Sequence, residues 1–298
     1  MALIHYFVTI LSIIFVLASP LVLAEPQSDS AVLLRVDQSG KGDFTKIQDA
    51  IDSVPSDNKE LVFILVKPGI YKEKVVVPAD KPYITISGTK ASVTIITWND
   101  SGDIFDSPTF SVLASDFVGL QDTLLDDNGR HYYKNCYIEG ATDFICGNAA
   151  SLFEKCHIHS LAEGTGSITA QRRESPSEET GFVFLGCNIS GVRTALLGRP
   201  WGSHSRVIFA FSYISSAILP QGWDDWGNSN THSTVYYGQY KCYGRGSGMS
   251  KRVQYARNFT SEEVEPFLTQ DFIGGKDWIR PVPTKFTKAT FKRVGAKN

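Results

Sequence analysis

The chain has 298 residues, with 29 Lys and Arg against 31 Asp and Glu, which gives a net charge of −2. A charge so close to neutral argues against nucleic acid as a partner, because nucleic-acid-binding proteins carry a basic surface. The sequence contains no CxxC motif and no His-rich cluster, so we expect no metal site.

Residues 1–24 contain no Lys, Arg, Asp or Glu, and they end in the small-residue pattern Val22-Leu23-Ala24 before Glu25. This pattern predicts a secretory signal peptide, although the missing basic residue near its start leaves an uncleaved membrane anchor open. No later apolar stretch is long enough to span a bilayer. We therefore expect a secreted protein whose single domain covers residues 25–298. Glycosylation sequons begin at Asn99, Asn188 and Asn258.

Apolar residues recur at helical spacing between Asp43 and Val54, at Phe44, Ile47 and Ile51. We expect a short helix here, capped by Asp43, that covers the open end of a stacked structure. Strand-like runs follow at Leu61–Val66, Val75–Val77, Tyr83–Ser87, Val93–Thr97 and Phe110–Leu113.

Later in the chain, the polar stretch 172–180 is predicted to be a surface loop. Thr260 and Glu263 form a capping-box pattern that predicts a C-terminal helix packed on the rest of the domain.

A repeated unit links the middle of the chain. An aromatic residue, two variable residues, a small Cys or Ser, one variable residue and Ile recur, with the small residue at 136, 156, 187 and 212. Repeats of 20 to 50 residues indicate stacked architectures, and the β-branched and aromatic runs favour strands. The sequence therefore predicts an all-β fold, a right-handed parallel β-helix with short capping helices.

Three of the five cysteines, Cys136, Cys156 and Cys187, share the small-residue position of this repeat. Two interpretations remain open. The favoured one is an inward stack of small apolar side chains. The other is a disulfide, for which Cys156 with Cys187 is the best candidate because they lie on successive coils.

Asp122 and Asp143 lie 21 residues apart, close to the repeat period. In a solenoid such residues lie side by side, about 4.8 Å apart. Neighbouring carboxylates push each other's pKa values apart, so that one stays ionised while the other keeps a proton. That division suits acid–base or nucleophilic chemistry.

Four segments, in order, resemble the pectin methylesterases of plants and their pathogens. They are Gly69-Ile70-Tyr71-Lys72-Glu73, Gln121-Asp122-Thr123-Leu124, Gly140-Ala141-Thr142-Asp143-Phe144-Ile145-Cys146-Gly147 and Leu197-Gly198-Arg199-Pro200-Trp201-Gly202. The segment Gln221–Trp226 is similar to the family's late Trp-rich segment. The resemblance runs from about residue 31 to the C-terminus.

The resemblance implies a right-handed parallel β-helix that hydrolyses the C6 methyl esters of galacturonate in pectin. It implies that Asp143 is the nucleophile and that Asp122 is the general acid and then the general base. Gln121 would donate to the oxyanion, Arg199 would hold the Asp143 carboxylate, and Trp201 would lie against a sugar ring. It implies no metal and no organic cofactor. The expected partners are methyl-esterified pectin and a proteinaceous inhibitor, and we expect a monomer.

Physical chemistry supports these roles independently of the resemblance. A guanidinium both positions a carboxylate and lowers its pKa. A neutral amide stabilises an oxyanion without neutralising the nucleophile. Each residue also has a purely structural explanation. Either aspartate alone could cap a turn, and Arg199 could be an ordinary ion-pair partner. Trp201, Trp223 and Trp226 could pack under the C-terminal segment. The Glu73 segment is better explained as structural than as catalytic.

The chain departs from the family before Gln121. The family has a Gln about 20 residues earlier that supplies a second oxyanion donor, whereas this chain has no Gln between Gln48 and Gln121. About 30 to 40 residues are missing by comparison, more than one coil at the usual repeat length. Leu120, Leu125 and Cys146 also stand where the family often has aromatic residues.

We therefore expect a pectin methylesterase with impaired activity. Three alternatives stay open: a catalytically inactive pectin-binding wall protein, another β-helix pectin enzyme such as a polygalacturonase or lyase, and a form that does not fold stably. Because the domain starts soon after the signal peptide, we expect no inhibitory pro-region.

Overall fold

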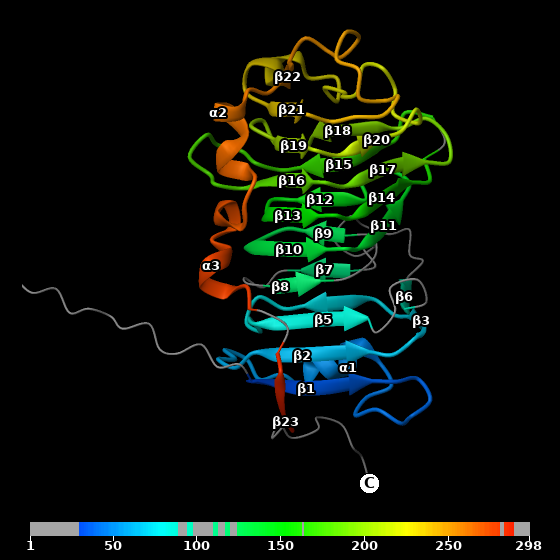
Figure 1. Ribbon diagram of the computed structural model, residues 1–298, viewed down its shortest axis with the longest axis vertical. Coiled ribbons are helices and arrows are strands. Elements are labelled where there is room, and N and C mark those ends of the chain that lie inside the picture. Colours follow the sequence, from blue (N-terminus) through cyan, green and yellow to red (C-terminus); the bar gives the residue numbers. More distant parts are fainter. Residues whose placement is uncertain are drawn as a thin grey trace, which may run out of the picture.

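The computed structural model describes residues 30–88, 94–97, 110–112, 117–119, 124–162, 164–280 and 283–288. Its strands stack in a right-handed parallel β-helix (Figure 1), which confirms the predicted fold. The largest sheet has 11 strands in the order β22-β21-β19-β16-β13-β10-β8-β5-β2-β1-β23. These strands are β1 (Ser30–Val36), β2 (Val62–Val66), β5 (Ile84–Gly88), β8 (Phe117–Gly119), β10 (Arg130–Lys134), β13 (Ala150–Glu154), β16 (Gly181–Leu185), β19 (Arg206–Ala210), β21 (Tyr236–Tyr240), β22 (Ala256–Asn258) and β23 (Lys285–Lys288).

The other faces of the solenoid are a six-stranded sheet, β18-β15-β12-β9-β7-β4, and a third face divided into a four-stranded and a two-stranded sheet. The six-stranded sheet consists of β4 (Val75–Val77), β7 (Phe110–Val112), β9 (Leu124–Asp126), β12 (Ile145–Gly147), β15 (Ser167–Gln171) and β18 (Leu196–Pro200). The third face consists of β3 (Gly69–Lys72), β6 (Thr94–Thr97), β11 (Tyr137–Gly140), β14 (His157–Ser160), β17 (Asn188–Gly191) and β20 (Tyr213–Ile214).

The repeat seen in the sequence is the register of this stack. Phe153 pairs with Tyr133 on one side and with Phe184 on the other, and Phe184 pairs with Phe209. Their rings stack inside the solenoid with centroids 4.7, 4.6 and 4.6 Å apart. The Ile positions of the repeat form a second buried column, namely Ile138, Ile158, Ile189 and Ile214.

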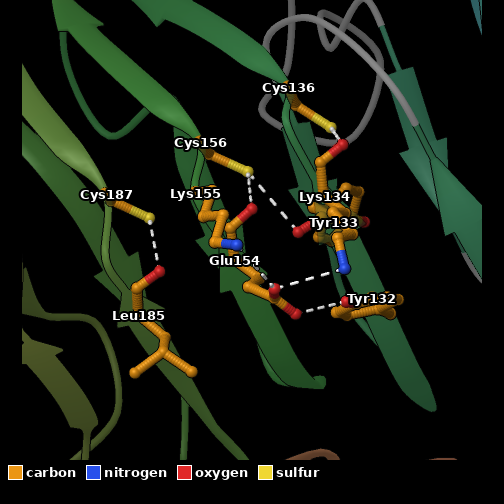
Figure 2. A network of polar contacts seen from close by, with 9 residues as sticks. All are labelled: Tyr132, Tyr133, Lys134, Cys136, Glu154, Lys155, Cys156, Leu185 and Cys187. Atoms are coloured by element: carbon orange, nitrogen blue, oxygen red, sulfur yellow. Dashed lines mark hydrogen bonds and ion pairs between the residues drawn. The ribbon is translucent and has the colours of Figure 1, made fainter.

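The cysteines of the repeat form a column of free thiols, as the favoured interpretation predicted. All five cysteines are free. Each thiol in the column donates to backbone carbonyl oxygens. Cys156 Sγ lies 3.4 Å from the oxygen of Tyr133, and Cys187 Sγ lies 3.8 Å from that of Leu185 (Figure 2). Cys187 Sγ also lies 3.2 Å from the oxygen of Phe153. Burial raises the pKa of the Cys187 thiol, which keeps it protonated as a donor. Cys242 repeats the contact one turn beyond Ser212, with Sγ 3.3 Å from the oxygen of Phe209.

The N-terminal helix α1 covers Ile47–Asp52, a shorter span than the spacing predicted. Its apolar residues enter the core at the β1 end of the solenoid. The predicted cap by Asp43 is wrong, because the Asp43 carboxylate instead accepts from Arg35 N at 2.8 Å. The helix is capped by Glu73, whose carboxylate oxygens accept from Ile47 N at 3.0 Å and Gln48 N at 2.9 Å. Glu73 therefore has the structural role that the sequence favoured.

Short helices after β22 pack along the outer face of the 11-stranded sheet (Figure 1). They are α2 (Ser261–Val264), the 3₁₀ turns η3 (Glu265–Phe267) and η4 (Gln270–Ile273), and α3 (Gly275–Trp278). The predicted capping box is present: Thr260 Oγ1 accepts from Glu263 N, and the Glu263 carboxylate accepts from Thr260 N. Stretch 172–180 links β15 to β16 without regular secondary structure, as predicted.

One coil of the solenoid is shorter than its neighbours. From the start of β8 at Phe117 to the start of β10 at Arg130 the coil takes 13 residues. The next coil, from Arg130 to the start of β13 at Ala150, takes 20 residues. Only residues 120–123, outside the described part, separate β8 from β9. The 11- and six-stranded sheets nevertheless continue through this coil, since β8 pairs with β5 and β10, and β7 pairs with β9. On the third face, the described strands before and after this coil, β6 and β11, belong to two separate sheets. This is the place where the sequence departs from the family.

The stacked rings generate a stability prediction. Phe184 is fully buried between two parallel rings, so Phe184→Ala should lower the free energy of unfolding by about 3–5 kcal/mol. Tyr243→Ala, at a ring that is mostly exposed, should change it by less than about 0.5 kcal/mol. Denaturant unfolding of both variants measures the difference, and equal small effects would contradict the stacked core.

Candidate active site

The predicted Asp143–Arg199 pair is formed. Asp143 lies in the turn between β11 and β12, and Arg199 lies in β18, two coils further on. The guanidinium forks onto the carboxylate, with Nε 3.0 Å from Oδ1 and Nη2 2.5 Å from Oδ2. The side chains are only 13% exposed for Asp143 and 26% for Arg199. A bidentate, partly buried pair fixes both the position and the orientation of the carboxylate.

The backbone at Asp143 is itself constrained. Its φ angle is +52°, in the left-handed region that non-glycine residues seldom occupy. The Asp143 N–H donates to the Ser167 oxygen one coil later at 2.6 Å. Gly140 is needed at the start of this turn, because a Cβ there would lie 2.3 Å from Cβ of Phe144. Strain of this kind persists where the surrounding structure holds it, which is common at functional sites.

The pKa of Asp143 is raised, whereas the sequence analysis expected Arg199 to lower it. Burial raises the pKa of Asp143 above its ordinary value of 3.8, Arg199 opposes that rise, and Asp224 adds to it. The expected lowering by Arg199 is therefore present, but the loss of solvation outweighs it. Arg199 fixes the position of the carboxylate, but the carboxylate still accepts a proton at a higher pH than an exposed Asp does.

Gln121 and Asp122 lie outside the described residues, so the proximity of the two aspartates remains a prediction. The register beside them has the expected offset, since Leu124 pairs with Ile145 and Leu125 with Cys146. These pairs are 21 residues apart, as are Asp122 and Asp143.

The floor of the site is a column on the outer face of the six-stranded sheet. Leu125, Cys146, Ala170 and Arg199 occupy successive positions in it. Trp201 packs on the first three of these residues, and the Arg172 guanidinium lies 5.1 Å from its ring centroid. Trp201 is thus placed beside the pair, but it also has a packing role. Burial raises the pKa of Cys146 to about 12, so this thiol is a neutral part of the floor.

The sequence did not identify Trp226 as a site residue. Its ring lies over the Arg199 guanidinium, 3.7 Å from carbon Cζ to the centroid, while 43% of the side chain stays exposed. The resemblance of the Gln221–Trp226 segment to the family was the available signal. Trp223 in the same segment is packing: it is buried and stacks on Tyr237 at 4.2 Å.

Acidic side chains fix the turn that carries Trp226. The residue has a φ of +54°, and its N–H donates to Asp224 Oδ1 at 2.6 Å. Asp225 accepts from Gly227 N at 2.9 Å and pairs with His232 Nε2 at 2.9 Å. His232 stacks on Tyr255 with ring centroids 4.2 Å apart. The indole is therefore held over Arg199 by its own turn.

His131 has a structural role that does not involve this site. Its Nδ1 lies 2.5 Å from Oδ1 of Asp126, and both side chains are fully buried. Tyr133 and Ser151 also donate to the Asp126 carboxylate. The described residues contain no group of three or more His, Cys, Asp or Glu arranged to hold a metal ion. They also contain no helix long and apolar enough to cross a membrane.

The fold and the site geometry place the chain in the class of parallel β-helix proteins that carry an arginine-held aspartate on an outer sheet. Comparison with known proteins narrows this class. The Pectinesterase family profile matches residues 33–119 and 111–276. The chain belongs to the pectinesterase family, whose members are carboxylic ester hydrolases that demethylesterify pectin. The two matched ranges overlap at residues 111–119, at the short coil.

Two plant relatives and one solved structure illustrate the match. "Putative pectinesterase 11" of Arabidopsis thaliana is 53% identical, with 87% of this chain and 84% of that protein covered. "Pectinesterase QRT1" of the same plant is 38% identical, with 82% and 78% covered. The structure of pectin methylesterase from carrot superposes with a TM-score of 0.74 at 28% identity, covering 86% of this chain and 97% of that one.

Arg199→Gln tests the electrostatics of the pair. The substitution removes the positive charge that lowers the pKa of Asp143, so the acid limb of the pH–rate profile for ester hydrolysis should move to higher pH. Loss of the fork should also slow the plateau rate about 100-fold. Methanol release measured against pH gives both values. Arg257→Gln, at an exposed pair with Glu263, is the control, and an acid limb that does not move would contradict the assignment.

Trp226→Ala tests the indole over Arg199. A cation–π contact of about 0.5–2 kcal/mol predicts a loss of about 2- to 30-fold in kcat/KM. Trp226→Phe keeps a weaker ring and should lose less. Initial rates on methylated pectin measure the series, with Tyr243→Ala as control. Wild-type rates in both Trp226 variants would show that the ring does not support the pair.

Proposed function

We propose that this chain hydrolyses the C6 methyl esters of galacturonate units in cell-wall pectin, with Asp143 as nucleophile. The observation that carries the proposal is the Arg199 fork on Asp143 at the outer face of the six-stranded sheet. Carboxylates are weak nucleophiles unless they are positioned and kept ionised. The fork orients the carboxylate, and the N–H donation from Asp143 to the Ser167 oxygen holds the backbone that carries it.

The reaction we propose has two steps. The Asp143 carboxylate attacks the ester carbonyl, and Asp122 gives its proton to the departing methoxide, which leaves as methanol. Asp122 then takes a proton from water, which attacks the acyl–Asp143 anhydride. This attack releases the galacturonate carboxylate and restores Asp143. Gln121 donates to the oxyanion that forms in each step. The raised pKa of Asp143 sets the lower pH limit at which the nucleophile is ionised.

Aromatic side chains beside the pair are suited to sugar rings. Trp201 packs beside the Arg199 column, and Trp226 is partly exposed above Arg199. An indole face fits the apolar face of a pyranose. A pectin methylesterase of the same fold, 20% identical with a TM-score of 0.63, has been solved in complex with a hexasaccharide.

We propose further that activity is impaired. The two ranges of the family match overlap at the short coil, where the second oxyanion donor is missing from the sequence. Loss of one such donor typically costs about 100- to 1000-fold in turnover. The Asp143–Arg199 pair lies beyond this coil, and contacts between neighbouring coils preserve it.

A catalytically inactive pectin-binding protein remains the second candidate, and the missing donor favours it. The polygalacturonase or lyase alternative is set aside, because the chain belongs to the pectinesterase family. We also retain as proposals the signal peptide at residues 1–24, secretion to the cell wall as a single-domain monomer, and binding of a proteinaceous inhibitor.

Methanol release from highly methylated pectin by residues 25–298 tests the function. We expect slow release, and Asp143→Asn should abolish it because an amide cannot act as the nucleophile. Asp80→Asn, at an exposed site, should match the wild type. A cooperatively folded protein that binds pectin without releasing methanol would select the inactive candidate. Equal release by Asp143→Asn and wild type would refute Asp143 as nucleophile.

A further inference from the structure

A second arginine, Arg172, lies on the outer face of the six-stranded sheet beside the candidate active site. Arg172 follows β15 and Trp201 follows β18, and because these strands pair in register the two residues lie opposite each other. The Arg172 N–H donates to the Gly147 oxygen at 2.8 Å, which extends the ladder past the end of β15. Trp201 is two residues beyond Arg199, a distance of roughly 7 Å along a strand. Arg172 is therefore outside the Asp143–Arg199 pair but on the same face.

The Arg172 guanidinium is held in place without being saturated. Its Nη2 donates to Asp127 Oδ1 at 2.9 Å, and its Cζ lies 5.1 Å from the centroid of the Trp201 ring. Arg199, by contrast, uses both Nε and Nη2 on Asp143. A guanidinium has five N–H donors, and within the described part of the chain Nη2 of Arg172 is the single guanidinium nitrogen with an acceptor. The Arg172 side chain is 34% exposed, so an acceptor from solution can approach it.

Charges differ on the two sides of the site. Asp224 lies opposite Arg199 on the next coil, because its N–H donates to the Gly198 oxygen at 3.2 Å and its neighbour Trp223 bridges to Gly198. The Asp224 side is therefore acidic, whereas the Trp201 side carries the Arg172 cation. A free carboxylate on a bound sugar is repelled at Asp224 and attracted at Arg172. The polarity of the face thus distinguishes a charged sugar from an esterified one.

The Asp127 carboxylate reduces the charge of Arg172 but also fixes the guanidinium. Asp127 Oδ2 accepts from Asn128 Nδ2 at 2.9 Å, and the Asp127 side chain is only 11% exposed. The guanidinium therefore lies between a mostly buried carboxylate and the Trp201 ring, which supports it through a cation–π contact. An arginine held in this way loses little side-chain freedom when it binds a ligand.

We propose that Arg172 binds the free carboxylate of a de-esterified galacturonate in the same pectin chain whose methyl ester lies at Asp143. This inference rests on the proposed function, because it takes pectin as the ligand. Guanidinium suits a carboxylate, since its N–H donors match the two oxygens. Pectin that has lost some of its methyl esters presents such carboxylates near intact esters. Arg172 is then a specificity-determining residue that favours partly de-esterified pectin over the fully methylated polymer.

Calorimetric titration with two hexagalacturonates, one de-esterified and one fully methyl-esterified, tests this assignment. An Asp143→Asn background prevents hydrolysis during the titration. Arg172→Gln should weaken binding of the de-esterified ligand about tenfold, because a charge-assisted contact is lost, and should change binding of the methylated ligand less than about twofold. Arg172→Lys keeps the charge and should recover part of the loss. Raising the ionic strength should reduce the preference of the parent protein.

Arg257→Gln is the matched control. Arg257 also pairs with an acidic residue, Glu263, at 3.5 Å and lies over an aromatic ring, Tyr236, at 4.8 Å, but it belongs to the 11-stranded sheet. This variant should bind both ligands as the parent does. Circular dichroism checks that each variant is folded.

A loss confined to the de-esterified ligand in Arg172→Gln, and absent in Arg257→Gln, supports the assignment. Unchanged binding of the de-esterified ligand, or equal weakening of both ligands, would overturn it. The binding readout needs no turnover, so the two proposals fail separately. A selective loss in a protein that releases no methanol supports Arg172 and counts against the esterase alone. Methanol release by the wild type without a selective loss in Arg172→Gln overturns the Arg172 assignment alone.

Discussion

Parallel stacking of successive coils in register is the constraint on which the rest of the structure depends. Each strand places its residues directly above those of the strand one coil earlier, about 4.8 Å away. Identical residue types therefore form continuous columns: the rings from Tyr133 to Phe209, the isoleucines and the thiols. The same register carries the outward column that ends in Arg199. The core and the candidate site thus share one geometric cause.

The stacking register is kept in two of the three faces across the short coil between β8 and β10. Among the described residues, the 11- and six-stranded sheets remain continuous through it, whereas β6 and β11 on the third face belong to separate sheets. Coils contact mainly their neighbours, so a solenoid survives the loss of a coil when the two cut faces match. The buried valines and isoleucines on the N-terminal side and the ring column on the C-terminal side belong to one hydrophobic core. We infer that the missing segment lowers the rate of ester hydrolysis, through a lost oxyanion donor, more than it lowers the stability of the core.

Much of the fold could be predicted because the repeat is visible in the residues themselves. The aromatic, small and Ile positions gave the strand register, and the Thr260–Glu263 capping box gave the C-terminal helix. The cap of α1 could not be found, because Glu73 reaches it from the connection between β3 and β4, 26 residues further along the chain. Likewise, Asp143 and Arg199 were identified by the family motifs, but the net effect of burial on Asp143 and the position of Trp226 depend on tertiary packing.

Hydrogen exchange under increasing denaturant tests most directly whether register persists across the short coil. Amides of β2 and β5, before this coil, and of β13 and β16, after it, report on the two sides. A continuous solenoid predicts that all four strands lose protection together, with one dependence on denaturant. Loss of protection in β2 and β5 at clearly lower denaturant would show two separate units, and would contradict the claim that stacking holds the candidate site together across the deletion.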